Sequence, residues 1–363
     1  MTILSLRMQH AFLFCWVIGL VDTFANPSLQ PFAIEVVDHA TGRGVPLVEL
    51  NTVAKHRFVT DSSGLIAIDS PELMGQEVFF HIASHGYEMA ADGFGYRGIR
   101  LHVRPGDSST VRIRRLNIAE RLYRITGAGI YRDSLTLGRP VPINSPLLNA
   151  QVCGQDSVQA VSRGDMVFWF WGDTERLAYP LGNFNTAGAI SKLPTAGGLR
   201  PDQGINLDYF TGDDGFSRPM FERENGVLIW VDGAFVLPDP KGIDRVVVHY
   251  SRRKNLEKQL SHGLATLNET TKRFETILEL SDHESLHPAG QAFRAVDAGQ
   301  EYIHFATPYP TVRVPARWES ILEPSQYEAY SPLQLGIKIQ PGAVALPDQL
   351  DRDSSGRVTF GWK

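Results

Sequence analysis

Short apolar segments separated by turn-forming residues run through most of the chain from Phe32 onward. In the first part they recur about every ten residues, and no amphipathic helix pattern lies between them. The separating sequences, such as D-S-S-G (61–64) and D-P-K-G (239–242), combine residue types that favour tight turns. Glycine (33 residues), proline (22) and aromatic residues (10%) are frequent enough for a turn-rich β protein. We therefore expect an all-β fold.

Length and charge limit the architectures and partners to consider. At 363 residues the chain is too long for one small core, so we expect two domains after any signal is removed. The formal net charge is -5. This charge gives no reason to expect nucleic acid or an anionic membrane as a partner.

The N-terminus has the pattern of an export signal over residues 1–25. Arg7 and His10 precede an apolar run over residues 11–21, and a small-residue cleavage site follows. The run is about half the length that spans a bilayer. We expect a secreted or periplasmic protein with no membrane contact after cleavage, and an uncleaved membrane anchor is the alternative. Cleavage would leave Cys153 as the only cysteine, so no internal disulfide is expected.

Residues 30–115 are expected to form an antiparallel β-sandwich. Seven candidate strands support this architecture, over residues 32–38, 47–51, 57–60, 65–68, 77–82, 99–103 and 110–115. Three segments, V-V-D-H-A-T-G-R-G-V-P-L-V-E-L (36–50), V-T-D-S-S-G-L-I-A-I (59–68) and H-G-Y (85–87), resemble the carboxypeptidase-regulatory-like, or prealbumin-like, sandwich. The resemblance implies an accessory module of an exported protein.

A linker over residues 116–146, rich in proline towards its end, separates this domain from a second β-rich domain over residues 147–363. Candidate strands in the second domain cover residues 157–161, 166–171, 226–231, 245–250, 274–280, 302–306, 311–314 and 357–362. Strong strands with aromatic ends and long loops favour a β-propeller. No repeat is visible at the usual blade period, so a second sandwich of lectin type stays open.

The segment Gly154–Asn185 places one aspartate before an apolar strand and another after the next strand. Asp156 and Asp173 are 17 residues apart, and a tight hairpin would bring both carboxylates to the same end. This arrangement builds an acidic site at the mouth of a β-structure. The alternative is that each aspartate only caps a turn through side-chain to backbone hydrogen bonds.

Two longer segments carry a second resemblance. The sequence G-Q-D-S…F-W-F-W-G-D-T-E-R…Y-P-L-G-N-F-N resembles the opening blade of five-bladed propeller glycosidases, the furanosidase-like group that includes D-arabinan-cleaving enzymes. The segment from R-V-V-V-H-Y to R-F-E-T (245–276) is similar to a middle blade of related exported propellers, and together the two cover roughly 150–320. In that family, carboxylates at the inner ends of the first blade cleave a glycosidic bond. The matching residues are Asp156 and Asp173.

Paired carboxylates suit this chemistry because one protonates the leaving oxygen while the other acts as base or nucleophile. The resemblance therefore implies an exported glycoside hydrolase-like protein whose partner is a polysaccharide or oligosaccharide. A non-catalytic carbohydrate-binding protein or a structural cell-envelope protein is the alternative.

Candidate substrate-binding residues lie in the same two segments. Asn183 and Asn185 have amides for sugar hydroxyls, although asparagine beside glycine also forms turns. Trp171 offers a stacking surface, but it shares a strand face with Trp169, so at least one of the two is expected in the core. Arg176 is expected to orient the acidic pair or to lie on the surface. His262 completes the set as an imidazole in the middle-blade segment, with a structural role as the alternative.

Other chemistry has little support. The chain has no G-x-S-x-G, H-E-x-x-H or C-x-x-C motif and no glycine-rich phosphate loop, and we expect neither a metal ion nor another cofactor. D-R-D-S-S-G (351–356) lacks the glutamate that ends a calcium loop, so we expect a hairpin turn there. The sequence ends just after the candidate strand 357–362, where related propellers continue, and we expect an incomplete, truncated propeller. The sequence predicts no oligomeric state.

Overall fold

A computed structural model describes residues 30–281, 290–306, 310–337 and 344–363. The expected signal peptide over residues 1–25 lies outside the described residues. Within them the chain is all-β, as expected, with only two short α-helices, α1 (Arg132–Thr136) and α2 (Trp318–Ile321). Single 3-10 turns occur at η1 (Pro71–Leu73), η2 (Pro194–Ala196), η3 (Pro324–Gln326) and η4 (Pro347–Gln349). None of the described helices has the length and apolar character of a membrane span.

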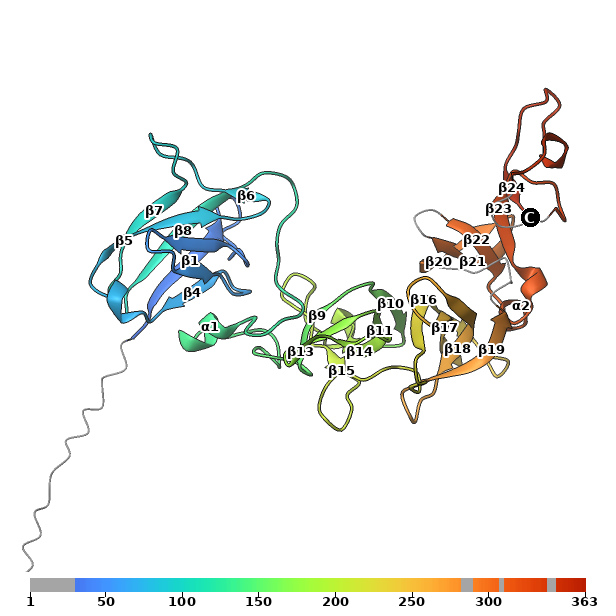
Figure 1. The fold of residues 1–363 in the computed structure, drawn as a ribbon, viewed down its shortest axis with the longest axis horizontal. Helices are drawn as coiled ribbons and strands as arrows, with labels where there is room; N and C mark the ends of the chain where they lie inside the picture. Colours follow the sequence, from blue (N-terminus) through green and yellow to red (C-terminus); the bar gives the residue numbers. More distant parts are fainter. Residues whose placement is uncertain (1–29, 282–289, 307–309, 338–343) are drawn as a thin grey trace, which may run out of the picture.

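The first part of the chain is a sandwich of two four-stranded sheets (Figure 1). One sheet contains, in spatial order, β4 (Leu65–Ile68), β1 (Phe32–Asp38), β8 (Ser108–Arg115) and β6 (Tyr87–Glu88). The other contains β3 (Arg57–Val59), β2 (Glu49–Thr52), β5 (Glu77–Ala83) and β7 (Gly98–His102). Both sheets contribute to one core, which includes Ile34, Leu50 and Phe80.

One strand pair differs from the expected antiparallel sandwich. β1 and β8 run parallel, with Val36 opposite Val111, whereas the other pairs of these two sheets are antiparallel. Alternating hydrophobicity predicts which face of a strand is buried, but it carries no information about the direction of the neighbouring strand. The parallel pair brings the first and last strands of the sandwich side by side.

The linker is docked on the sandwich. The Oδ2 atom of Asp61 accepts hydrogen bonds from both the backbone N–H and the hydroxyl of Ser134 in α1, each at 2.6 Å. The N–H of Ser62 donates to the carbonyl of Ile130 at 2.8 Å. The Arg121 guanidinium donates to backbone carbonyls of the sandwich at Pro46 and His85. These contacts hold the linker against the sandwich between residues 121 and 134.

Three sheets follow in chain order along the elongated molecule (Figure 1). Sheet I contains β10 (Gln159–Arg163), β11 (Met166–Trp171), β14 (Ala187–Lys192) and β15 (Asp208–Tyr209). Sheet II contains β16 (Leu228–Pro238), β17 (Asp244–Arg253), β18 (Gln259–Leu267) and β19 (Phe274–Ser281). Sheet III contains β20 (Gln291–Asp297), β21 (Gln300–Ala306), β22 (Pro310–Pro315), β23 (Glu328–Ser331) and β24 (Gly361–Trp362). Neighbouring strands within each sheet are antiparallel.

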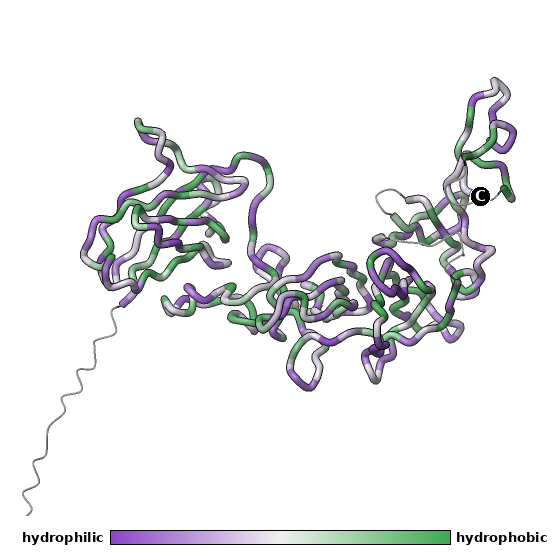
Figure 2. The backbone as a smooth tube through the Cα atoms, in the orientation of Figure 1, coloured by the Kyte–Doolittle hydropathy of each residue, from purple (hydrophilic) through white to green (hydrophobic). Residues whose placement is uncertain are grey.

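Sheet II packs against other sheets on both faces, which explains the continuous apolar run of its strand β17. Val246 and Val248 of β17 face a core shared with sheet I, and Val247 faces a core shared with sheet III. A strand buried on both faces reads as a continuous apolar run instead of an alternation. Figure 2 shows hydrophobic segments gathered in the strands and hydrophilic segments in many of the connecting loops.

The first strands of the three sheets lie next to one another. β10 contacts β16, and β16 contacts β20. The side-chain amide of Gln291 in β20 accepts from the N–H of Ala160 in β10 at 3.4 Å and donates to the carbonyl of Ala160 at 3.2 Å. The three sheets therefore converge on their first strands.

Candidate acidic site

A small three-stranded sheet carries both predicted catalytic aspartates at one of its ends. Its strands, in spatial order, are β13 (Tyr179–Asn183), β12 (Thr174–Arg176) and β9 (Val152–Gln155). Asp156 directly follows β9, and Asp173 directly precedes the antiparallel strand β12. The strand directions therefore bring the two residues together. The predicted hairpin is also present as β10 and β11, where Gln159 lies opposite Phe170, and the two aspartates flank its open end.

Three hydrogen bonds join the two segments. Asp156 Oδ1 accepts the N–H of Asp173 at 3.1 Å, and the N–H of Asp156 donates to the carbonyl of Asp173 at 3.3 Å. The N–H of Gly172 donates to the carbonyl of Asp156 at 3.0 Å. The carboxylate of Asp156 thus caps the neighbouring chain, and at the same time it is held beside Asp173.

The two carboxyl groups have different surroundings. Asp156 is exposed, whereas Asp173 is half-buried and its Oδ1 atom is enclosed without a hydrogen-bond partner among the described residues. Burial and, second, the charge of Asp156 raise the pKa of Asp173. Ser157, which follows Asp156, has a left-handed backbone with φ of 52°, a conformation that costs free energy for a residue other than glycine. The segment is held in a strained conformation at the acidic site.

A hydrogen-bond chain behind the acidic pair consists of residues that the sequence reasoning did not select. The Tyr209 hydroxyl donates to Gln155 Oε1 at 2.8 Å, and Gln155 Nε2 donates to Thr174 Oγ1 at 3.2 Å. Burial raises the pKa of Tyr209, which keeps it a neutral donor. Gln155 and Thr174 are the immediate chain neighbours of the two aspartates, and this adjacency is the signal that could have identified them.

Asn183 and Asn185 connect the site to sheet II. Asn183 is 2% exposed and its Oδ1 accepts the N–H of Asn185 at 3.1 Å. Asn185 Oδ1 accepts the N–H of Ile229 at 2.9 Å. The Nδ2 atom of Asn183 is buried and has no hydrogen-bond partner within the described part of the chain. Asn183 lies opposite Thr174 in the small sheet, so this free amide belongs to the same end as the acidic pair.

The structure places Arg176 and Trp171 away from the substrate-binding roles considered for them. Arg176 donates to Asp214 Oδ2 at 2.8 Å and to Gln151, so it orients this turn instead of the acidic pair. Trp171 is 7% exposed and packs against Trp169 and Tyr209. It is the core member of the tryptophan pair, as expected for at least one of them.

His262 is fully buried between sheets II and III. It lies in β18, and its ring stacks on that of His249 with centroids 5.5 Å apart. His249 in turn packs edge-on against Phe305 of sheet III. This position is within the core between the sheets, away from the acidic pair on the small sheet. Within the described ranges, no group of three or more His, Cys, Asp or Glu side chains is arranged to bind a metal ion.

The turn residues behave as the sequence predicted. Asp353 Oδ1 accepts the backbone N–H groups of Ser355 and Arg357, at 2.8 and 3.0 Å, and closes a hairpin turn.

Comparison with known proteins adds no family assignment, because no protein-family model matches the chain and no curated protein is significantly similar to it in sequence.

Proposed function

We propose that the chain is an exported glycoside hydrolase-like protein that acts on a polysaccharide, with Asp173 as general acid. The observation that carries the proposal is the asymmetry of the acidic pair. One carboxyl group is half-buried with a raised pKa, and the other is exposed and held beside it. Glycoside hydrolysis needs such a pair, one protonated and one ionised.

The chemistry follows from these positions. The Asp173 carboxyl group gives its proton to the glycosidic oxygen as the bond from that oxygen to the anomeric carbon breaks. The Asp156 carboxylate takes the proton of the water that attacks the anomeric carbon. Alternatively it attacks that carbon itself, and a water that gives its proton to Asp173 then hydrolyses the glycosyl ester. The enclosed, unpartnered oxygen of Asp173 supports the acid role, because a neutral carboxyl group is favoured there over a carboxylate.

The arrangement of the sheets supports a propeller-like architecture. Sheets I, II and III are successive antiparallel sheets whose first strands lie side by side, as in neighbouring blades of a propeller. The acidic pair lies on the small sheet, whose strand β9 precedes sheet I in the chain and whose strands β12 and β13 come between β11 and β14 of sheet I. This location corresponds to the first blade, where the resemblance to furanosidase-like propellers places the acids.

The direct test is a screen of the purified chain against furanose- and uronate-containing polysaccharides, with release of reducing ends as the measurement. New reducing ends that depend on Asp173 support a hydrolase. The second candidate is a carbohydrate-binding protein without turnover, favoured by the capping hydrogen bond that occupies Asp156 Oδ1. If the chain is retained on a polysaccharide and no new reducing ends appear, the carbohydrate-binding function is supported.

Gly172→Ala is expected to lower hydrolysis on the order of 10²-fold, because a small misplacement of a catalytic group has effects of this size. A Cβ at this position would lie 2.6 Å from Asp156 Oδ1 and would push the carboxylate away. The clash is with the end of an exposed side chain, so the free energy of unfolding should change by only about 1 kcal/mol or less. Initial rates and urea unfolding check both parts. Gly93→Ala is the matched control, because a Cβ there meets no atom within 4 Å.

Asp156→Asn is expected to lower the pKa of Asp173, since the charge of Asp156 is the second cause that raises it. Burial remains, so the pKa should stay above that of an exposed aspartate. Carbon NMR titration of the Asp173 carboxyl group measures the pKa without any substrate. Asp214→Asn should leave it unchanged, because Asp214 pairs with Arg176. An unchanged pKa in Asp156→Asn would show that the two carboxyl groups do not interact.

A further inference from the structure

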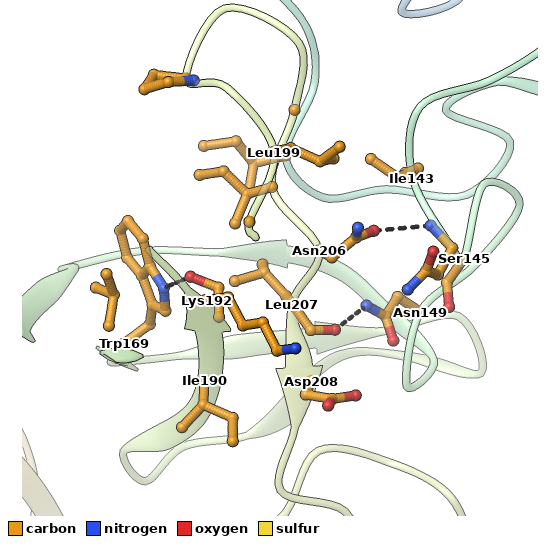
Figure 3. Close-up of a pocket in the computed structure, with 18 of the residues that line it drawn as sticks. Ile143, Ser145, Asn149, Trp169, Ile190, Lys192, Leu199, Asn206, Leu207 and Asp208 are labelled. Carbon is orange, nitrogen blue, oxygen red and sulfur yellow. Dashed lines mark hydrogen bonds between the residues drawn. The ribbon is translucent and has the colours of Figure 1, made fainter. Parts of the chain in front are cut away.

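A second candidate site lies between the linker and sheet I. A cavity of about 590 Å³ is bounded by the linker, by β11 and β14, and by the loop that joins β14 to β15 (Figure 3). This volume is in the range of pockets that hold small organic ligands. Its lining contains neither Asp156 nor Asp173. The cavity is therefore distinct from the acidic site.

An aromatic side chain forms one wall in a fixed orientation. Trp169 lines the cavity and is half-buried, and its Nε1–H donates to Ser191 Oγ at 2.9 Å. Its ring lies nearly parallel to that of Trp171, with an interplanar angle of 13°. The hydrogen bond and the stacking hold the indole in place, so binding need not order it. An indole face is a large apolar surface for the C–H groups of a sugar ring.

Amide groups form the opposite side and are also held by the chain. Asn206 Oδ1 accepts the N–H of Asn144 at 2.8 Å, and Asn149 Nδ2 donates to the carbonyl of Leu207 at 2.7 Å (Figure 3). Each amide therefore keeps its second polar atom, a donor on Asn206 and an acceptor on Asn149, for a ligand. A ligand that satisfies both must offer donors and acceptors together, as hydroxyl groups do.

The charges of the lining favour a ligand without strong net charge. Lys192 and Asp208 are both exposed at the cavity and have opposite signs. Arginine is the residue best suited to bind a phosphate or carboxylate through two parallel hydrogen bonds. Among the described residues that line the cavity there is no arginine. A hydroxyl-rich ligand fits this set better than a nucleotide or a phosphate ester.

The cavity is built by parts of the chain that are bonded to one another. The Tyr123 hydroxyl of the linker donates to the carbonyl of Pro201 in the β14–β15 loop at 3.0 Å. Arg43 of the sandwich donates to the carbonyl of Asp202 in the same loop. These hydrogen bonds join the linker and the sandwich to the β14–β15 loop that lines the cavity. The chain itself therefore forms the site without a ligand.

We propose that this cavity binds a short saccharide segment, with Trp169 as stacking surface and Asn206 and Asn149 as hydrogen-bonding partners. The proposal goes beyond hydrolysis and does not require it. If the acidic pair cleaves a polysaccharide, the cavity would hold another portion of carbohydrate beside the linker.

The test is calorimetric titration of the full chain carrying Asp173→Asn with short, uncharged arabinofuranose and galactose oligosaccharides. We expect saturable binding of at least one probe. Adding Trp169→Ala should weaken it about tenfold or more, which corresponds to about 1.4 kcal/mol. Adding Asn206→Asp should weaken it roughly two- to tenfold, the effect of one lost hydrogen bond. This second variant keeps the oxygen that accepts from Asn144, so the loop should remain folded.

Two controls lie outside the cavity. Phe94→Ala removes an aromatic ring that is 90% exposed on the sandwich, and Lys241→Gln removes a lysine from an exposed turn. Both controls should bind like the parent. No saturable binding of either probe, or equal binding by the Trp169→Ala and Asn206→Asp variants and their parent, would overturn the proposal. Binding that depends on Trp169, together with no release of reducing ends by the unsubstituted chain, would support this site and reject the hydrolase.

Discussion

Asp173→Asn should reduce polysaccharide hydrolysis by about 10²–10⁴-fold, the usual contribution of a general acid. Asparagine has nearly the same shape but cannot give a proton to the glycosidic oxygen. The half-buried position of Asp173 and its raised pKa are the reasons to assign the acid role to this residue of the pair. Initial rates of reducing-end release measure the effect. Asp213→Asn, in an exposed turn, is the matched control and should retain full activity.

The same substitution should stabilise the fold at pH values above the pKa of Asp173, which separates a catalytic loss from unfolding. The folded-state pKa of Asp173 is raised, so its contribution to stability is present at acidic pH and is lost as the pH rises through that pKa. Above that pKa the ionised group is a cost that asparagine removes. Urea unfolding over a range of pH should therefore show a more stable variant above the pKa and a smaller difference as the pH falls. Full hydrolysis by this stable variant would remove Asp173 from the mechanism.

The sequence predicted the class of fold and the strongest strands, and it missed both buried and exposed strands. β14 and β18 are mostly buried, but their alanine, glycine, serine and histidine residues weaken the apolar signal. The segment 166–171 matches β11, and 245–250 lies within β17. β20 was missed because its side chains are mostly exposed or half-buried, so the apolar signal of a strand is absent. The expected strand 357–362 is a strand only at Gly361–Trp362, because the turn at Asp353 occupies the residues before it.

At the candidate site, the sequence predicted which residues neighbouring strands bring together. It did not predict contacts between residues from distant parts of the chain. The pairing of Asp156 and Asp173 follows from two neighbouring strands and a turn, which a sequence can predict. The partner of Arg176 is Asp214, 38 residues later, and the stacking of His262 on His249 depends on the register of β17 and β18. The cavity beside Trp169 requires the linker to fold back on sheet I, for which the sequence has no motif.

Asp61→Ala should destabilise the chain by about 3 kcal/mol or more, because it leaves buried donors without partners. Asp61 is 2% exposed, and Ser134 is fully buried. Oδ1 of Asp61 accepts the N–H groups of Ser63 and Leu65, while Oδ2 accepts the two donors of Ser134. The substitution therefore breaks a turn and the docking of α1 together. Urea unfolding and limited proteolysis of the linker over residues 116–131 measure the two effects.

The chain contains a matched control, since D-S-S-G occurs at both 61–64 and 353–356. Asp353 accepts the equivalent turn hydrogen bonds, but in place of the buried Ser134 its Oδ2 meets the exposed side chain of Arg357. Asp353→Ala should therefore cost only about 1 kcal/mol and leave the linker protected from protease. Equal losses of stability in the two variants would mean that the turn, and not the docked linker, accounts for the contribution of Asp61 to the free energy of unfolding. A larger loss at Asp61, with faster cleavage of the linker, would show that this carboxylate fastens the linker to the sandwich and so maintains one wall of the cavity beside Trp169.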